Sequence, residues 1–319
     1  MPKNDSDVPQ LRLVGAFAGI GSGLTKVAVG HGFDTIKTRM QCAPPGTYTN
    51  ALDVLFKTVR LEGIRALYKG ATPPAVGWAA IDSLLLGSLH NYRLFLHRHG
   101  MTEISQTSGQ NRLTVFGHGI AGLLAGLTSA LIATPMELLK VKLQIQSQKL
   151  VRDRQFKGPI DCGRKIVQVQ GLRGLWSGFS GSLIFRSNFF WMFLSVEALM
   201  RSFSRLAGTP YEISTGTANF LSGGFASFVF WAMAIPADNI KNRMMAHPHP
   251  LTYPTSRPEK RWRTPSFPSV ARQIFMQDGI KGFYRGLGPC FLRAFPANAS
   301  ALFVYEGTMR LLGAEHTRH

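Results

Sequence analysis

Six long stretches of the chain are mostly apolar, and polar segments separate them. They cover residues 11–41, 73–97, 113–144, 179–203, 213–245 and 289–312. Each is long enough to cross a bilayer as a helix, which takes about 20 residues. None is free of polar side chains over such a length, so hydropathy alone supports few of them. Helices that line a water-filled cavity keep one polar face and fit this pattern.

Shorter amphipathic segments lie between these stretches. Residues 51–61, 160–170 and 269–277 have apolar positions at helical spacing, such as Leu52, Leu55, Phe56 and Val59 in the first. Helices of this kind lie on a membrane surface, so we expect three surface helices. Residues 98–112 are polar and predict a loop.

A short pattern recurs near the ends of the first, third and fifth apolar stretches. An acid stands two places after an opening residue, and a lysine stands three places after the acid: Asp34 and Lys37, Glu137 and Lys140, Asp238 and Lys241. The opening residue is Pro135 or Pro236 in the later copies and Gly32 in the first. Proline kinks a helix by removing a backbone donor, whereas glycine only permits a bend.

A second pattern also occurs three times. It reads acid-Gly, four residues, aromatic-basic-Gly, and its copies end at the evenly spaced Gly70, Gly178 and Gly286. In the second copy Gln170 and Ser177 replace the acid and the base. Evenly spaced copies indicate three structural units, each too small to bury itself alone.

Both patterns, in triplicate over almost the whole chain, resemble those of the mitochondrial carrier family. The resemblance implies an all-α membrane protein with six transmembrane helices in three tandem pseudo-symmetric repeats and short surface helices on the matrix side. The repeats would be residues 9–98, 112–205 and 213–313, within one carrier domain, 1–319. It also implies a solute transporter of the mitochondrial inner membrane that works by alternating access through one central site.

Composition narrows the alternatives. The chain has 36 Lys+Arg against 17 Asp+Glu, which suits nucleic acid or an anionic membrane surface. The basic residues are spread over links and helix ends, so a basic soluble nucleic-acid-binding protein is the less favoured alternative. The scattered Cys42, Cys162 and Cys290 predict neither a disulfide framework nor a zinc site. We therefore expect no bound metal. The sequence contains no recognisable set of catalytic residues, so we do not expect an enzyme.

The acid and lysine within one copy are neighbours on a helix face, so a local pair is one possibility. By resemblance, each acid instead meets the lysine of the next repeat and closes a matrix-side gate: Asp34 with Lys140, Glu137 with Lys241, Asp238 with Lys37. In the family a glutamine beneath each ion pair braces it. The equivalent positions in this sequence are Gln41, Gln144 and Met245, and methionine has no amide, so the third brace is missing. Exposed pairs contribute ~0–1 kcal/mol each, so we expect a gate that a substrate can open.

The family's opposite, cytosolic gate is degraded in this chain. The resemblance places Arg93, Glu197 and Glu306 there, with Glu306 and Arg93 as the ion pair, and implies a weak gate. Ordinary helix-end charges explain the same residues.

Substrate contacts of the family lie on the even-numbered helices about two turns after the closing glycine. Seven places after each closing glycine stand Gly77, Phe185 and Arg293, and the neighbours Trp78 and Arg186 are further candidates. Two guanidinium groups in a membrane cavity favour a carboxylate or phosphate, although each could be a structural arginine.

Asp82 could bind an ammonium group, which with Arg293 fits an amino acid or carnitine-like zwitterion. Residues 293–299 resemble the carnitine/acylcarnitine and ornithine branch of the family. In that branch an acid follows the fourth-helix arginine, whereas Ser187 follows Arg186, which weakens the case for carnitine and basic amino acids. A di- or tricarboxylate or a nucleotide is the alternative solute.

Glycines that open helices beside basic residues resemble the family's cardiolipin sites. They are Gly70, Gly158 and Gly286, and Gly178 without the base. Backbone N–H groups at a helix start bind phosphate. We therefore expect bound cardiolipin, no other cofactor, and a monomer.

Overall fold

A computed structural model describes residues 7–44, 46–104, 109–148, 154–206, 208–247 and 265–311. Its long helices are α1 (Asp7–Cys42), α3 (Thr72–Arg98), α4 (Val115–Gln144), α6 (Phe179–Ser187) followed by α7 (Phe189–Ser204), α8 (Thr215–Ala246) and α10 (Leu287–Leu311). Short helices are α2 (Ala51–Glu62), α5 (Pro159–Gln170) and α9 (Phe267–Phe283), with 3-10 turns η1 (Ile64–Tyr68) and η3 (Leu172–Trp176). The predicted all-α fold of three repeats, each with two long helices and one short helix, is confirmed.

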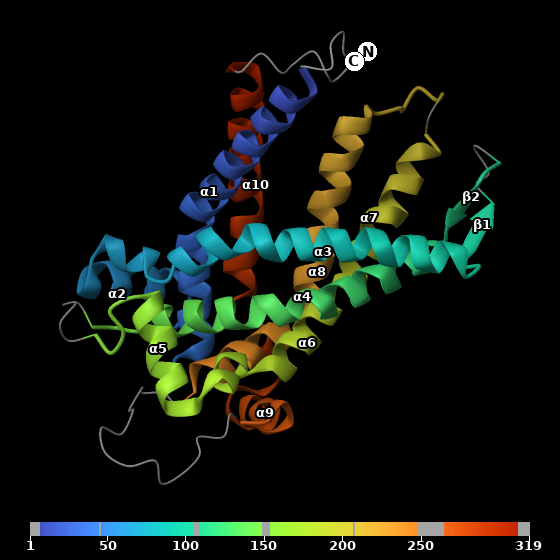
Figure 1. Ribbon diagram of the computed structural model, residues 1–319. Coiled ribbons are helices and arrows are strands. Elements are labelled where there is room, and N and C mark those ends of the chain that lie inside the picture. Colours follow the sequence, from blue (N-terminus) through green and yellow to red (C-terminus); the bar gives the residue numbers. More distant parts are fainter. Residues whose placement is uncertain are drawn as a thin grey trace.

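Three helix pairs join the repeats to one another. Helix α1 packs along α10, α3 along α4, and α7 along α8, as Figure 1 shows. Each pair takes its two helices from different repeats, so the last repeat contacts the first. This closure brings together the C-terminal ends of α1, α4 and α8. These are the first, third and fifth of the six long helices, and we call them the odd-numbered helices; the other three are the even-numbered helices.

Glycines allow the close approach within the second repeat. A Cβ on Gly126 of α4 would lie 2.3 Å from the carbonyl oxygen of Arg186 on α6, and one on Gly122 would lie 2.7 Å from that of Phe189. Small residues of this kind let membrane helices pack backbone to backbone.

Only part of the helical bundle is strongly apolar. Within the described residues, three helices are long and apolar enough to cross a membrane by length and composition: Val115–Gln144, Leu172–Ser204 and Gly216–Ala246. Helices α1, α3 and α10 carry charged residues such as Lys26, Asp82 and Arg293 along their length. Charges inside a membrane helix usually face a bundle interior or cavity, which explains the weaker hydropathy of these three helices.

The closing glycines of the second pattern are required by backbone geometry. Gly70, Gly178 and Gly286 have φ of +76°, +85° and +87°, the left-handed region that favours glycine. A Cβ on Gly70 would also lie 2.9 Å from the carbonyl oxygen of Lys140. Each turn therefore redirects the chain into the next long helix and seats it against the neighbouring repeat.

Two local expectations were wrong. The fourth apolar stretch is not one uninterrupted helix, because it breaks at Asn188, whose side-chain amide donates to the carbonyl oxygens of Ile184 (2.9 Å) and Phe185 (3.2 Å). An asparagine side chain competes in this way with the helical backbone bonds. Residues 98–112 contain a small antiparallel hairpin, β1 (Thr102–Ile104) with β2 (Asn111–Leu113), in place of a plain loop.

The glycine packing of α4 generates a prediction. Gly126→Ala places a methyl group against the backbone of α6, so we expect a cost of about 1–3 kcal/mol and a lower unfolding temperature of the purified protein. Gly223→Ala is the matched control, since nothing lies within 4 Å of a Cβ at that position of α8. Equal unfolding temperatures for the two variants would contradict this packing.

Candidate functional site

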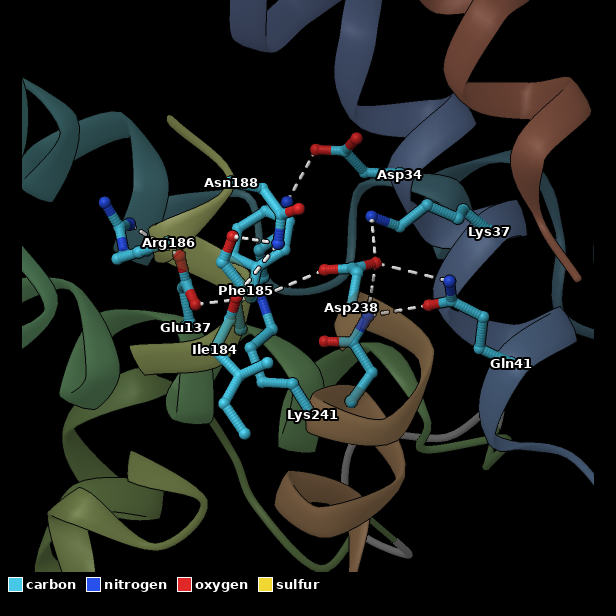
Figure 2. A network of polar contacts seen from close by, with 12 residues as sticks. Asp34, Lys37, Gln41, Glu137, Ile184, Phe185, Arg186, Asn188, Asp238 and Lys241 are labelled. Atoms are coloured by element: carbon cyan, nitrogen blue, oxygen red, sulfur yellow. Dashed lines mark hydrogen bonds and ion pairs between the residues drawn. The ribbon is translucent and has the colours of Figure 1, made fainter. Parts of the chain in front are cut away.

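The three ion pairs expected between repeats all form where the odd-numbered helices end. Lys140 Nζ lies 2.5 Å from Asp34 Oδ2, Lys241 Nζ 3.0 Å from Glu137 Oε2, and Lys37 Nζ 2.8 Å from Asp238 Oδ2. Figure 2 shows the second and third of these pairs close together. We call these six residues the charge ring.

Asp238 has the most partners in the charge ring. Besides Lys37, it pairs with Lys241 of its own helix at 3.0 Å, so the local pair that the spacing allowed also exists. Gln41 donates to its Oδ2 at 3.2 Å, and Asn242 at 3.1 Å (Figure 2). Gln41 therefore takes the position of a brace beneath this pair. The contribution of Asn242 was not anticipated, because nothing marks it in the sequence.

The side chain of Gln144 makes no hydrogen bond to an ion pair of the charge ring, so the expected brace at this position is absent. Its amide donates to Thr35 Oγ1 at 3.1 Å, and Thr35 in turn donates to the carbonyl oxygen of Leu67 at 2.7 Å. It therefore links the first two repeats through the residue next to Asp34. Met245, at the third position, is fully buried against an apolar cluster and has no amide to donate.

Both arginines expected at the substrate site bind acids of the charge ring. Arg186 donates to Glu137 Oε1 at 2.7 Å and to Ser129 Oγ at 2.9 Å, and Arg293 donates to Asp34 Oδ1 at 2.7 Å. Asp34 and Glu137 are thus each shared by a lysine and an arginine. Sequence reasoning missed this sharing because Asp34 and Arg293 lie at opposite ends of the chain.

The shared contacts leave an excess of positive charge. Five cations, which are Lys37, Lys140, Lys241, Arg186 and Arg293, surround three carboxylates. The side chains are largely buried, with 5% of Lys241 and 2% of Asp238 exposed. The ~0–1 kcal/mol expected for exposed pairs therefore does not apply, since removing one partner of a buried pair typically costs about 3–5 kcal/mol.

The remaining expected substrate contacts have different surroundings. Gly77 is a packing position and not an open contact, because a Cβ there would lie 3.0 Å from Met136 Cγ. The Trp78 ring lies 5.9 Å from Lys140 Nζ and 5.8 Å from the Arg293 guanidinium carbon.

Asp82, one turn along α3 from Trp78, is exposed and makes no hydrogen bond or ion pair with the side chains that the structure describes.

The other end of the bundle has no comparable charge ring in the described residues. The Arg93 guanidinium lies 5.6 Å from the Phe193 ring, and its buried Nε has no hydrogen-bond partner. Glu197 pairs with Arg201 of the same helix at 2.7 Å and lies 3.7 Å from His118. The side chain of Glu306 lies outside the described residues, so its expected pair with Arg93 stays a prediction.

Comparison with known proteins fits this geometry. The family described as "Mitochondrial carrier protein" matches residues 12–100, 111–206 and 214–316. The chain belongs to the mitochondrial carrier family. It is therefore a transporter of small-molecule solutes with six membrane helices in three repeats.

Relatives of this carrier have different solutes in their names. It is 34% identical over 93% of both chains to mitochondrial magnesium exporter 1 of Drosophila melanogaster. It is 30% identical to the mitochondrial carnitine/acylcarnitine carrier protein of Mus musculus, over 92% of this chain and 93% of that one. It is also 30% identical to a glutamate/glycine mitochondrial carrier of Schizosaccharomyces pombe, over 95% and 94%.

The second pattern of this carrier forms an ion pair within each outer repeat. Glu62 lies 2.5 Å from Lys69, and Asp278 lies 3.3 Å from Arg285. Burial raises the pKa of Glu62, but hydrogen bonds from Arg39 and Lys69 outweigh it and hold that pKa below its usual value. In the middle repeat Ser177 donates to Gln170 at 3.2 Å. The two departures from the pattern therefore occur as a matched neutral pair.

A second set of cations also joins the repeats, and the sequence analysis did not anticipate it. The residue two places after each ring lysine donates to carbonyl oxygens at the end of the next odd-numbered helix. Arg39 reaches Gln144 at 3.0 Å, Lys142 reaches His247 at 2.8 Å, and Arg243 reaches Gln41 at 2.8 Å. Cations are favourable there because the last carbonyls of a helix lack intrahelical partners.

Asp238 provides the test of the charge ring. Asp238→Asn leaves two buried lysines without their shared carboxylate, so we expect a loss of about 3–5 kcal/mol and a lower unfolding temperature. The control is Asp161→Asn on surface helix α5, a partly exposed residue whose pair with Lys165 should contribute within about 1 kcal/mol. If the two variants unfold at the same temperature, the ring does not stabilise this state.

Proposed function

We propose that this carrier moves a carboxylate-bearing metabolite, such as an amino acid or a carnitine ester, across the mitochondrial inner membrane. Transport proceeds by alternating access through one central site. The observation that carries the proposal is the imbalance of five cations against three carboxylates around the charge ring. A positive excess inside a membrane protein is costly unless an anion binds there.

The arginines connect binding of the solute to the matrix gate. A carboxylate that enters the cavity can take over the guanidinium hydrogen bonds of Arg293 and Arg186, which are otherwise made to Asp34 and Glu137. The ring acids then keep fewer partners, and the closed state loses stability. A solute shifts such an equilibrium only by binding the two states differently, and this competition supplies the difference.

The described contacts support a state that is closed toward the matrix. The charge ring joins all three repeats, whereas at the Arg93 end the described ion pairs lie within the second repeat or join it to the link before it, Arg201 with Glu103. The surface helices would face the matrix, and the Arg93 end would face the cytosol. Coupled exchange of two solutes follows if the charge ring opens only when a solute is bound in the cavity.

Asp82 favours a zwitterion over a simple anion. Its side chain is exposed and has no hydrogen-bonding partner among the described residues. It could accept an ammonium group while Arg293 binds the carboxylate of the same solute. The charge excess at the ring argues against a bare divalent cation, although one relative is named a magnesium exporter.

A dicarboxylate is the second candidate solute. The ring and its two arginines carry two positive charges more than they carry negative ones, which matches a dianion. Asp82 distinguishes the two candidates, because its carboxylate would attract the ammonium group of a zwitterion but repel a dianion.

The lipid and the oligomeric state belong to the same proposal. Lys69 uses its ammonium on Glu62 and on the carbonyl oxygens of Gln146 (2.8 Å) and Gln148 (3.0 Å). Cardiolipin would therefore be held by backbone N–H groups at the helix start that follows Gly70 more than by this lysine. The carrier would act as a monomer, because its three repeats already complete the charge ring.

Arg293 provides the first transport test. Arg293→Gln removes a charge-assisted hydrogen bond of about 1.5–3 kcal/mol, so we expect uptake into proteoliposomes to fall roughly 10- to 100-fold. The screen uses carnitine, glutamate, ornithine and malate as separate solutes. Arg205→Gln, an exposed residue at the end of α7, should keep normal uptake. Unchanged uptake of every transported solute by Arg293→Gln would remove it from the site.

Asp82 provides the second transport test. For a zwitterionic solute, Asp82→Asn removes the partner of the ammonium group, and we expect uptake to fall at least tenfold. For malate we expect uptake to be unchanged or higher, because a repulsive carboxylate is gone. Loss of malate transport in this variant would contradict the assignment of Asp82 to an ammonium group.

A further inference from the structure

Every lysine of the charge ring lies over an aromatic ring. Lys241 Nζ is 3.9 Å from the centre of the Phe185 ring, Lys37 Nζ is 4.7 Å from that of Trp231, and Lys140 Nζ is 5.9 Å from that of Trp78. Ammonium groups within about 6 Å of a ring centre are attracted by the negative face of the π system. The three contacts involve three different helices, so one local sequence motif does not explain them.

The contact of Lys241 is the closest of the three. Its ammonium lies 3.0 Å from Glu137 and 3.0 Å from Asp238, and the Phe185 ring lies beside it (Figure 2). The side chain is 5% exposed, so little water reaches it. Cation–π contacts are strongest when the cation is desolvated. The ring thus replaces part of the solvation that a buried ammonium loses.

Neighbouring aromatic residues fix these rings in place. The Phe185 ring centre lies 6.2 Å from that of Trp231 and 5.8 Å from that of Phe230. Phe185 and Trp231 are therefore adjacent, and each contacts one of the two lysines that share Asp238. The two lysines share one carboxylate, and each lies over one of two adjacent aromatic rings.

We propose that Phe185, Trp231 and Trp78 are positioning residues of the matrix gate. Their rings hold the ammonium groups against the ring carboxylates and offset part of the charge excess, so they favour the closed state. The inference rests on the proposed gate, but it concerns how the closed state is stabilised and not which solute is carried.

A double-mutant cycle tests the closest contact. The full-length carrier is purified with Phe185→Leu, with Lys241→Met and with both changes, and its unfolding is measured without any solute. If the ring acts on the ammonium, Phe185→Leu should raise the unfolding equilibrium constant about tenfold more in the native background than beside Lys241→Met. Phe185→Tyr, which keeps a ring, should restore most of the difference.

Phe230→Leu is the matched control, because that ring packs on Phe185 and none of the described cation–π contacts involves it. Its effect should be the same with and without Lys241→Met. Equal effects of Phe185→Leu in the two backgrounds would overturn the proposal and leave Phe185 as a packing residue. If Phe185→Leu does not fold, the cycle of Trp231→Leu with Lys37→Met is judged by the same criterion. Because no solute is used, a failed uptake screen leaves this result interpretable.

Discussion

Three buried carboxylates, Asp34, Glu137 and Asp238, hold the ends of the odd-numbered helices together by binding cations from all three repeats. The rest of the bundle depends on this sharing. Two of the helices that meet there contain a proline, Pro135 in α4 and Pro236 in α8, and the turns at the closing glycines lead into the neighbouring long helices. Because the carboxylates are outnumbered, the proposed mechanism has a solute carboxylate disturb this closed ring. The same electrostatic contact would then serve both structure and transport.

The three interfaces between repeats, which we call seams, are not equivalent. The seam between the third and first repeats has an amide beneath its ion pair, from Gln41, and a capping arginine backed by Asp278. The seam between the second and third repeats has Met245 in place of the amide. Its capping cation, Lys142, binds carbonyl oxygens only, because Gln170 stands where the other repeats have an acid. Three departures from the repeat pattern, Gln170, Ser177 and Met245, thus lie at or beside one seam, whereas the fourth, Gly32, lies in the first repeat.

Burial decides how strong these contacts are. An exposed salt bridge gains little, since water screens the charges and the side chains lose freedom. In a buried pair the cost of removing both charges from water offsets most of their attraction. Breaking the pair is nevertheless costly, because it leaves one buried charge without a partner. The charge ring belongs to the second case. In the proposed mechanism a solute must therefore replace lost partners by binding the arginines that hold the ring acids, while the proposed role of the aromatic rings is to keep the lysines in place.

The sequence by itself determined the repeats, the helical stretches and the six candidate residues of the charge ring, because Asp34, Glu137 and Asp238 recur with their lysines in each repeat. It left open whether each acid pairs within its own helix or with the next repeat, and the family resemblance supplied the second choice. In the structure Asp238 makes both kinds of pair. Only the tertiary structure decided which groups break that symmetry. Arg186 and Arg293 sit at unequal distances from their closing glycines, yet each reaches a ring acid. The break at Asn188, the packing of Gly77 on Met136 and the rings over the lysines likewise depend on side-chain directions across helices, which no spacing along one chain specifies.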